Sequence, residues 1–228
     1  MQLTDLSSRV IPAIEYHRER WRNRLGWTRE ILRLGDAQRW ALRLSIAEIE
    51  QNAAFSAFPD VDRELVLLRG NGMRLDFGAA AGSEGGGLQD GAPLDPAGHA
   101  IPAPACAAGS DRRVELLPPY QRVRFAGEDT VRATLLDGPT QDFNLMWRRD
   151  LLRAELLHRP LVGSMMFFAD RDSAWAIHLL AGQASFGRDS GLPPLAAGDT
   201  AWLSASTRTR YLLDGGGELL AIRVSQLA

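Results

Sequence analysis

The chain has 228 residues, with 26 Lys plus Arg against 28 Asp plus Glu, and every one of those 26 cations is arginine. The absence of lysine excludes Schiff-base and pyridoxal phosphate enzymes and P-loop nucleotide hydrolases, because each needs a lysine for chemistry or phosphate contact. A hydrophobic content of 45% rules out overall disorder. The net charge of -2 argues against a nucleic-acid partner, since such proteins usually gather a basic excess on one face.

The cysteine count and the N-terminus bear on the cellular compartment. Cys106 is the single cysteine, which excludes an intramolecular disulfide and a paired-cysteine metal site. The first ten residues lack the basic start and apolar run of a signal peptide, and no apolar segment reaches the length of a membrane span. We therefore expect a cytoplasmic protein without a membrane partner.

Short apolar runs separated by Gly, Pro, Asp and Asn predict an all-β chain. In the run 40–47, Trp40, Leu42 and Leu44 alternate with Ala41 and Arg43, as on a strand. A single short helix is predicted for 149–158, and the Gly, Ala and Pro-rich stretch 78–111 is expected to be a mobile insertion. The expected strands are 28–34, 40–48, 65–69, 73–77, 131–136, 143–148, 175–180, 200–204 and 219–224.

A weak internal repeat indicates duplication. Three short echoes occur in the same order, and the spacing between partners shrinks by about the length of the Gly/Ala/Pro-rich insertion. The turn-then-strand order after Gly182 is typical of a small cupin barrel. We therefore predict a double cupin, with residues 1–155 forming the first barrel and 156–228 a second, shorter one. The echoes are Phe58 to Asp62 with Phe168 to Asp172, Leu67 to Gly70 with Leu179 to Gly182, and Leu135 to Gly138 with Leu212 to Gly215.

The residues of common catalytic sites are scattered. Cupin enzymes usually hold a metal through two histidines separated by one residue, together with a carboxylate and a third histidine. Here His17, His99, His158 and His178 lie far apart in the sequence, and no Gly-x-Ser-x-Gly nucleophile elbow occurs. We expect no metal and no other cofactor.

Two polar clusters, 55–63 and 142–149, interrupt otherwise apolar strands. In the second cluster, alternation places Asp142, Asn144 and Arg148 on one strand face. Arginine offers a planar fork of donors that suits a carboxylate, and Asn or Ser adds short hydrogen bonds that set orientation. Two interpretations stay open: a pocket for a small anionic molecule, or an Asp–Arg network that satisfies itself inside the barrel.

The same residues carry a resemblance to the HutD/Ves family of bacterial histidine-utilisation and stress-associated proteins, over residues 21 to 149. The resemblance implies a double-cupin fold and an association with histidine catabolism, where such proteins are thought to bind a pathway intermediate and restrain pathway expression. It implies no established enzyme activity. The motifs are Trp21-Arg-Asn23-Arg-Leu-Gly26-Trp-Thr28-Arg-Glu30-Ile, Trp40-Ala-Leu-Arg43-Leu-Ser45-Ile-Ala, Phe55-Ser-Ala-Phe-Pro with Asp62-Arg63, Leu67-Leu-Arg-Gly-Asn-Gly-Met, and Asp137-Gly-Pro with Asp142-Phe-Asn144-Leu-Met146-Trp-Arg148-Arg149.

The chain departs from the family pattern in two glycine-containing motifs. Arg24-Leu25-Gly26 stands where the family usually has three consecutive glycines, and Phe58-Pro59-Asp60 stands where it has Phe-Pro-Gly. Glycine at such positions allows positive backbone angles or the close approach of a ligand.

Our first hypothesis is a non-catalytic, metal-free protein that binds a small carboxylate, such as urocanate or a formylglutamate-like intermediate of histidine degradation, and regulates histidine utilisation. Arg63, Arg43 and Arg148 are the candidate anion contacts. The remaining candidate ligand-binding residues are Asn144, Ser45, Ser56, Thr28, Glu30, Asp62, Asp142 and Asn23.

Two alternatives remain. One is a metal-independent isomerase or hydrolase that uses Glu30, Asp62 or Asp142 as a general base tuned by burial. The other is an interaction protein that contacts a regulator or pathway enzyme through the stretch 78–111. The second repeat lacks a counterpart of Arg63, so we expect it to serve as scaffold or as the surface of a homodimer.

Overall fold

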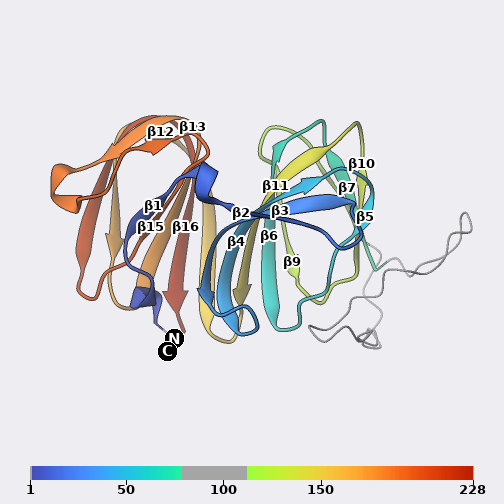
Figure 1. Cartoon of the computed structure of the whole chain (residues 1–228), viewed down its shortest axis with the longest axis horizontal. Coiled ribbons are helices and arrows are strands. Elements are labelled where there is room, and N and C mark those ends of the chain that lie inside the picture. Colours follow the sequence, from blue (N-terminus) through green and yellow to red (C-terminus); the bar gives the residue numbers. More distant parts are fainter. Residues whose placement is uncertain (1, 79–111, 228) are drawn as a thin grey trace, which may run out of the picture. The chain divides into compact units, whose positions relative to one another are not determined.

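The computed structural model describes residues 2–78 and 112–227, where β-strands and short 3-10 turns make up the regular structure (Figure 1). No helix in these two ranges is long and apolar enough to span a membrane. The predicted insertion lies outside the described residues from position 79 to 111. The elements are η1 Leu3–Asp5, β1 Arg9–Ile11, η2 Ala13–Glu15, β2 His17–Arg20, β3 Gly26–Gly35, β4 Trp40–Ile49, β5 Ala53–Ala54, β6 Val61–Arg69, β7 Met73–Phe77, β8 Arg112–Leu116, β9 Arg122–Ala126, β10 Val131–Leu135, β11 Thr140–Arg148, β12 Leu152–Ala169, β13 Ser173–Phe186, η3 Arg188–Ser190, β14 Leu195–Ala196, β15 Thr200–Leu203 and β16 Thr209–Gln226.

The chain divides into two compact units that interleave in sequence. The first unit holds Met1–Glu19, Arg29–Ile46 and Asn144–Ala228, and the second holds Arg20–Thr28 and Ala47–Phe143. The first unit therefore contains both the N-terminal and the C-terminal residues. The sequence instead predicts one domain boundary after residue 155. Strand β1 illustrates the grouping, because it pairs antiparallel with β15 near the other end of the chain.

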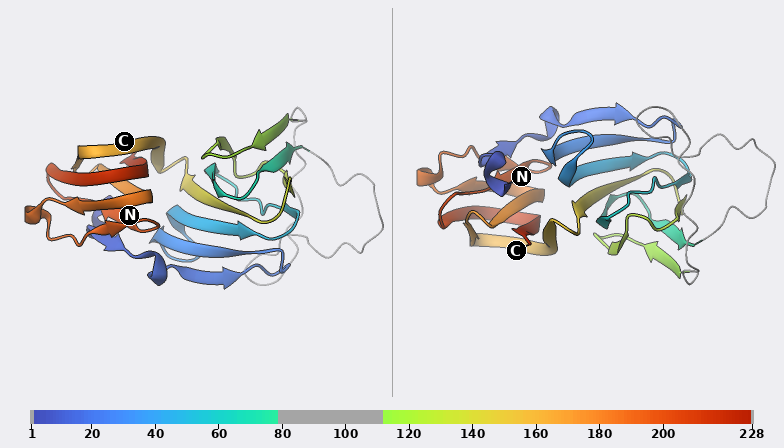
Figure 2. Two further views of the ribbon diagram at one scale, coloured as in Figure 1. Left: turned by 90° about the horizontal axis from the view of Figure 1, so that it is seen from above. Right: turned by 90° about the horizontal axis from the view of Figure 1, so that it is seen from below.

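The strands form three sheets, and the members of each lie side by side in Figure 2. One sheet has the order β1-β15-β13-β16-β12, with β14 paired to β13. The second has the order β5-β10-β7-β8, and the third β2-β3-β4-β11-β6-β9. Every strand pair whose register is defined is antiparallel. Many neighbours, such as β1 and β15 or β4 and β11, come from distant parts of the chain.

The core of the second unit is packed between two sheets. Strand β7 shows why: Met73, Leu75 and Phe77 are buried and alternate with half-buried Arg74 and Asp76, the period of a strand with one apolar face. These three side chains pack with buried residues of β4, β6 and β9 in one cluster. A barrel-like interior results, and its apolar members are Ala47, Ile49, Leu65, Leu67, Met73, Leu75, Phe77, Leu116, Val123, Phe125, Val131 and Ala133.

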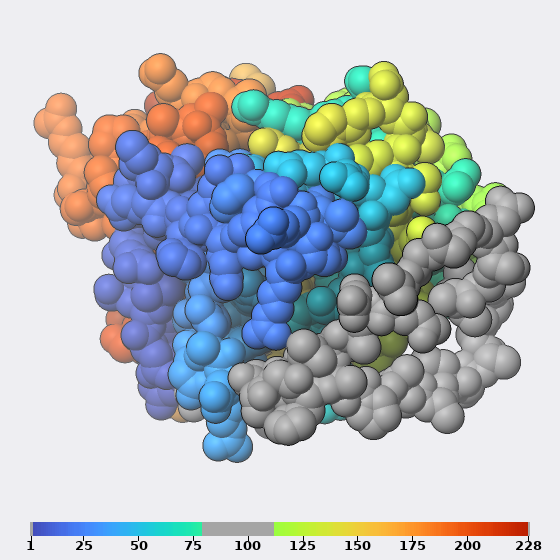
Figure 3. All heavy atoms as spheres, turned by 45° about the vertical axis from the view of Figure 1, so that its right-hand side comes forward, coloured from blue at the N-terminus to red at the C-terminus, as the bar shows by residue number. Residues whose placement is uncertain are grey.

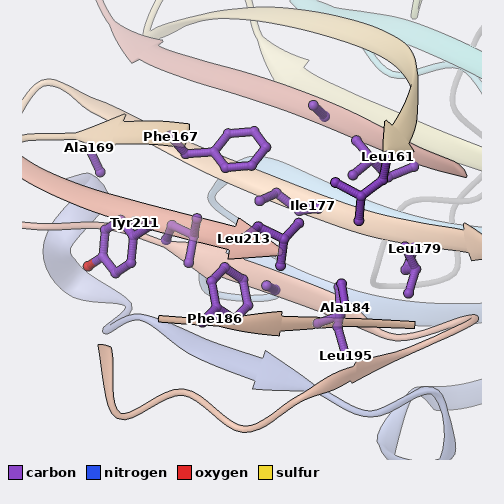
Figure 4. Close-up of a cluster of buried hydrophobic side chains, with 14 residues drawn as sticks. Leu161, Phe167, Ala169, Ile177, Leu179, Ala184, Phe186, Leu195, Tyr211 and Leu213 are labelled. Atoms are coloured by element: carbon purple, nitrogen blue, oxygen red, sulfur yellow. The ribbon is translucent and has the colours of Figure 1, made fainter. Parts of the chain in front are cut away.

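The first unit closes its core with three long strands. Buried side chains from both halves of β12, β13 and β16 meet in one cluster, together with residues of β14 and β15 (Figure 4). Glycines near the middle of these strands allow the sheet to fold over: Gly163, Gly182 and Gly217 have φ of 77°, 90° and 138°, a region that L side chains rarely adopt. A residue shift between Leu179 and Ala181 adds an irregularity at the same place in β13.

Two of the sheets repeat one strand order, in agreement with the echoes in the sequence. Strands β4, β11, β6 and β9 are neighbours in one sheet, and β12, β16, β13 and β15 follow in the same order in another. The long strand β13 corresponds to β6 plus β7, and β16 to β10 plus β11. Echoed Gly70 and Gly182 both have positive φ at these bends. The chain is thus the double cupin that the sequence predicts.

The predicted helix at 149–158 is wrong, because that segment forms the start of β12. Leu152, Ala154 and Leu156 are buried, whereas Arg153 and Glu155 between them are exposed, so the period is two. Each residue of the segment from Leu152 onward pairs with β16. The cross-strand hydrogen bonds override the local helix propensity of Leu, Arg, Ala and Glu.

Within the first unit, the N-terminal segment 2–19 forms hydrogen bonds with residues 198–202 near the C-terminus. The indole Nε1 of Trp202 donates to the Leu6 carbonyl at 3.0 Å, and the Tyr16 hydroxyl donates to the Gly198 carbonyl at 2.7 Å. The Ala13 amide donates to the Asp199 carboxylate at 2.8 Å. Residues of this segment, in dark blue, lie at the molecular surface in Figure 3.

Candidate functional site

Arg63 is a buried cation in the interior of the second unit. It lies on β6 between buried Val61 and Leu65, and its relative exposure is 6%. Directly opposite on β9 is Phe125, which belongs to the apolar cluster of this unit. Because opposed residues of an antiparallel pair project to the same side, the sheet itself places the guanidinium among core side chains.

Three aromatic rings surround the Arg63 guanidinium. Its Cζ lies 5.1 Å from the ring centroid of Phe125, 5.2 Å from that of Phe55 and 5.7 Å from that of Phe58. Cation–π contact uses the ring faces and leaves the arginine N–H groups to hydrogen bonds in the guanidinium plane. One of these, on Nη1, donates to the Ser56 carbonyl at 3.5 Å.

A second polar group lies at the start of β11. Asp142 has no solvent exposure and Thr140 only 2%, and both lie on the same strand face. Within the described ranges, the Thr140 hydroxyl and both carboxyl oxygens of Asp142 have no hydrogen-bond partner. Burial alone raises the pKa of Asp142 well above its usual range, because it disfavours the charged form of the carboxyl.

Other predicted site residues of the second unit form hydrogen bonds or ion pairs with neighbouring residues of the protein. The Thr28 hydroxyl accepts a hydrogen bond from the Trp21 indole at 2.8 Å, and the Asn23 side chain accepts the Leu25 amide at 3.0 Å within a turn. Asp62 faces away from the core and binds the Arg124 guanidinium at 2.6 Å. Asp62 is therefore an ion-paired surface carboxylate, a poor arrangement for a general base.

The remaining predicted residues belong to the first unit, where acids partner the two other arginines. Glu30 binds the guanidinium of Arg43 at 2.8 Å and that of Arg33 at 2.7 Å. Arg148 donates through Nε and Nη2 to both carboxylate oxygens of Asp150, at 2.9 and 2.8 Å. These hydrogen bonds hold the pKa of Asp150 below its usual range. The charge of each of these two arginines is therefore already paired with a carboxylate of the protein.

Ser45 and Asn144 are also in the first unit, and both are buried, with relative exposures of 4% and 6%. Asn144 follows Asp142 on the same face of β11, as the alternation of that strand predicts. Of the predicted residues, the structure pairs Arg43 with Glu30 and Arg63 with Ser56.

The two departures from the family's glycine pattern keep the backbone angle that glycine favours. Arg24 has φ of 60° and Asp60 has φ of 63°, both in the left-handed region. Each residue lies in a turn, where Arg24 donates its amide to the Trp21 carbonyl at 3.0 Å. The loop shape therefore persists although side chains replace hydrogens.

The described residues contain no group of three or more His, Cys, Asp or Glu side chains that could hold a metal ion. Buried His178 lies in the first unit, where its Nδ1 is 2.9 Å from the Thr200 hydroxyl. Burial is the main cause that lowers the pKa of His178 to about 4, and the charge of Arg29 adds to it. His99 lies outside the described residues.

Sequence reasoning missed Thr140 and the role of the aromatic rings around Arg63. Phe55 and Phe58 stand in the predicted cluster, but their contact with a cation depends on a turn that no periodicity reveals. Phe125 comes from a strand that was not predicted. Its alternation with Val123, both buried, is the signal that could have found it.

The chain is similar to known proteins in both sequence and structure. A family model described as HutD matches residues 13–99 and 106–221. Protein Ves of Cronobacter sakazakii is 30% identical over 208 residues, which cover 91% of this chain and 93% of that protein. An uncharacterized 21.2 kDa protein in the hutC 3' region of Pseudomonas putida is 33% identical over 151 residues, 64% of this chain and 62% of that protein. The solved structure of HutD from Pseudomonas fluorescens SBW25 matches with a TM-score of 0.72 and 23% identity, covering 97% of this chain and 100% of that one.

Proposed function

Because this chain belongs to the HutD family, we propose that it is a non-catalytic binding protein for a small carboxylate, recognised by Arg63. The observation that carries the proposal is the burial of this permanently charged side chain inside the apolar interior of the second unit. Arginine cannot discharge itself by losing a proton, so its burial is maintained at a cost in free energy. Recognition of an anion is a function that would justify that cost.

The surroundings of Arg63 suit a ligand with a carboxylate and a flat apolar part. The guanidinium fork can bind a carboxylate through two parallel hydrogen bonds. Phe55, Phe58 and Phe125 hold the guanidinium by its faces and supply apolar surface beside it. Urocanate combines a carboxylate with a flat ring, and formylglutamate-like acids combine carboxylates with an amide.

The physiological role proposed for this binding is the regulation of histidine utilisation. Two findings support this role: the chain belongs to the HutD family, and its P. putida relative is described as a protein in the hutC 3' region. In this role the ligand reports the level of a histidine-degradation intermediate, and no bond is made or broken. The ion pairs of Glu30 and Asp62 agree with this, because each carboxylate already binds an arginine.

Replacing Arg63 with methionine should weaken carboxylate binding and leave the protein folded. Methionine keeps the length and aromatic contacts of the side chain but removes its charge, so the free energy of unfolding should stay equal or rise. We expect the affinity for the best ligand to fall about tenfold to a hundredfold, the usual range for a lost hydrogen bond to a charged group. Titration calorimetry with urocanate, formiminoglutamate, formylglutamate and formate measures this; formate is included because the HutD structure is described as a formate condition.

Arg124→Gln is the matched control, because Arg124 lies on the neighbouring strand β9 and its charge is paired with Asp62 at the surface. This variant should bind as the unaltered protein does. Absence of heat with all four acids at millimolar concentration, in a folded sample, would refute carboxylate binding. Equal affinity of the Arg63→Met variant would instead show that another cation recognises the ligand.

A further inference from the structure

The β12–β16 face is an exposed sheet surface of the first unit. Phe167, Tyr211 and Leu213 of these two strands lie in the buried cluster (Figure 4), so the alternate residues of both strands project away from that core. Every one of these outward residues is exposed. The face is defined by Val162, Ser164, Met166 and Phe168 of β12 and by Arg210, Leu212, Asp214 and Gly216 of β16.

Large apolar side chains occupy the centre of this face. Met166 and Leu212 lie directly opposite each other on the two strands and are 57% and 39% exposed. Phe168 is 42% exposed although the Arg208 guanidinium lies 5.1 Å from its ring centroid, and Val162 is 88% exposed. The solvent side of an antiparallel sheet is usually polar, so apolar side chains gathered there mark a contact surface.

Small residues of the neighbouring strand lie beside this face. Strand β13 pairs with the other side of β16 and places Ser185 opposite Asp214. Gly187 follows directly after β13, and a Cβ there would lie 3.8 Å from the Leu212 side chain. The surface beside Leu212 is therefore low, which lets a second sheet approach to the ordinary stacking distance of about 10 Å.

Two opposite charges flank the apolar centre at equal distances. Arg210 comes two residues before Leu212 and Asp214 two residues after it, so each lies about 7 Å from Leu212 along the strand. The Ser164 hydroxyl donates to the Asp214 carboxylate at 2.7 Å. Neither Arg210 nor Asp214 forms an ion pair with another residue in the described ranges. Both charges are therefore available to a partner that carries an acid and a base at the same spacing.

We propose that two copies of this chain associate through the β12–β16 face, related by a two-fold axis that runs across the strands through Met166 and Leu212. Rotation about this axis reverses the strand direction, so Arg210 of each copy lies over Asp214 of the other and two intermolecular ion pairs form. Met166 and Leu212 lie over the same residues of the second copy, and their apolar surfaces are removed from water together. A second copy therefore matches this face in both its charges and its apolar centre.

The size of the face sets the strength of this association. It runs along β12 from Val162 to Phe168 and includes β16 and the adjoining part of β13. Its length is about 20 Å, since a strand rises about 3.3 Å per residue. Interfaces of permanent dimers are larger than this. We therefore expect a reversible dimer with a dissociation constant of about 10 to 100 µM.

Sedimentation equilibrium across about 5 to 500 µM protein tests the association. The unaltered protein should shift from monomer to dimer within this range. Met166→Glu should weaken the dimer more than about tenfold, because two carboxylates would face each other at the axis. Ile14→Glu is the matched control: Ile14 is 93% exposed in the first unit but lies outside the face, so the same change of charge should leave association unaltered. A monomer at every concentration, or a dimer equally stable in Met166→Glu, would overturn the proposal.

Charge exchange tests the two-fold arrangement itself. Arg210→Asp gives each copy two acids on the face, and Asp214→Arg gives each copy two arginines, so each variant alone should associate at least about tenfold more weakly. An equal mixture of the two variants restores both ion pairs in a heterodimer and should associate about as tightly as the unaltered protein. A mixture that stays monomeric would contradict the two-fold arrangement and with it the proposal.

The exchanged charges also separate association from folding. The double variant with Arg210→Asp and Asp214→Arg carries both charges in one chain and should dimerise with itself. The urea concentration at the unfolding midpoint should stay unchanged in each variant, because these positions are exposed. A folded double variant that remains monomeric would refute the pairing of Arg210 with Asp214. These experiments contain no ligand, and Arg63 lies in the second unit, so carboxylate binding is tested separately.

Discussion

Replacing Gly182 with alanine should lower the free energy of unfolding by about 4 kcal/mol, the sum of a left-handed backbone and a severe steric overlap. Gly182 has φ of 90°, and a Cβ there would lie 1.9 Å from the Gly216 carbonyl oxygen. That oxygen belongs to the backbone of β16, which pairs with β13 on one side and with β12 on the other. It cannot move without disturbing the bend that closes the core of the first unit.

Gly163→Ala is the matched control for this variant. Gly163 also has a positive φ, of 77°, but a Cβ there would meet nothing within 4 Å. Alanine should therefore cost only the backbone term, about 1 kcal/mol. Urea unfolding followed by tryptophan fluorescence measures both values. Equal losses in the two variants would show that the close approach of β13 and β16 at Gly182 is not what limits the stability of the bend.

Acidification from pH 6.5 to pH 4 should lower the stability of the protein by about 3 kcal/mol through His178 alone. The fold holds this imidazole neutral: burial first, and the charge of Arg29 second, lower its pKa from 6.5 to about 4, although Asp199 opposes the shift. The unfolded chain binds a proton at His178 near pH 6.5, whereas the folded chain binds it only near pH 4. The stabilising contribution is therefore complete above pH 6.5, declines as the pH falls, and levels off below pH 4.

His178 belongs to a buried hydrogen-bond network, and its burial is the main reason why protonation is resisted. Thr200 lies within 2.9 Å of the imidazole Nδ1 and within 2.7 Å of the Tyr16 hydroxyl, which donates to the Gly198 carbonyl. Burial likewise raises the pKa of Tyr16, so this hydroxyl stays neutral. A charged imidazole would lose its contact with solvent in this buried network.

His178→Gln tests the assignment, because glutamine keeps a polar group beside Thr200 but does not titrate. The difference between the unaltered protein and the variant, measured by urea unfolding at several pH values, should show the decline between pH 6.5 and 4. His17→Gln, at an exposed strand position, should leave the profile unchanged. A profile of the same shape in His178→Gln and in the unaltered protein would assign the pH dependence to carboxylates instead.

Local sequence patterns were sufficient for much of the fold. The prediction of a strand at 73–77 matches β7 at both ends, and the run 40–48 matches β4 to within one residue. Alternating burial is a local property, so it can be read from neighbours in the chain. The ordered echoes likewise predicted duplication, because equivalent bends in the two barrels need glycine at equivalent positions.

The lengths of the strands were harder to predict. Strands β12, β13 and β16 continue through glycines at which the sequence indicated turns. Whether a chain reverses or only bends at such a glycine depends on the strands available for pairing on either side. Tertiary contacts decide between reversal and bending, so the local sequence pattern does not predict which of the two occurs.

By itself, the sequence determined that the chain is an all-β double cupin, and that every permanent cation is an arginine suited to carboxylates. Only the tertiary structure decided which of the predicted arginines is buried. Arg43 and Arg148 meet Glu30 and Asp150, while Arg63 lies among three aromatic rings. The reason is physical: strand alternation fixes which face a side chain occupies, but the charge or ring that faces it comes from other parts of the chain.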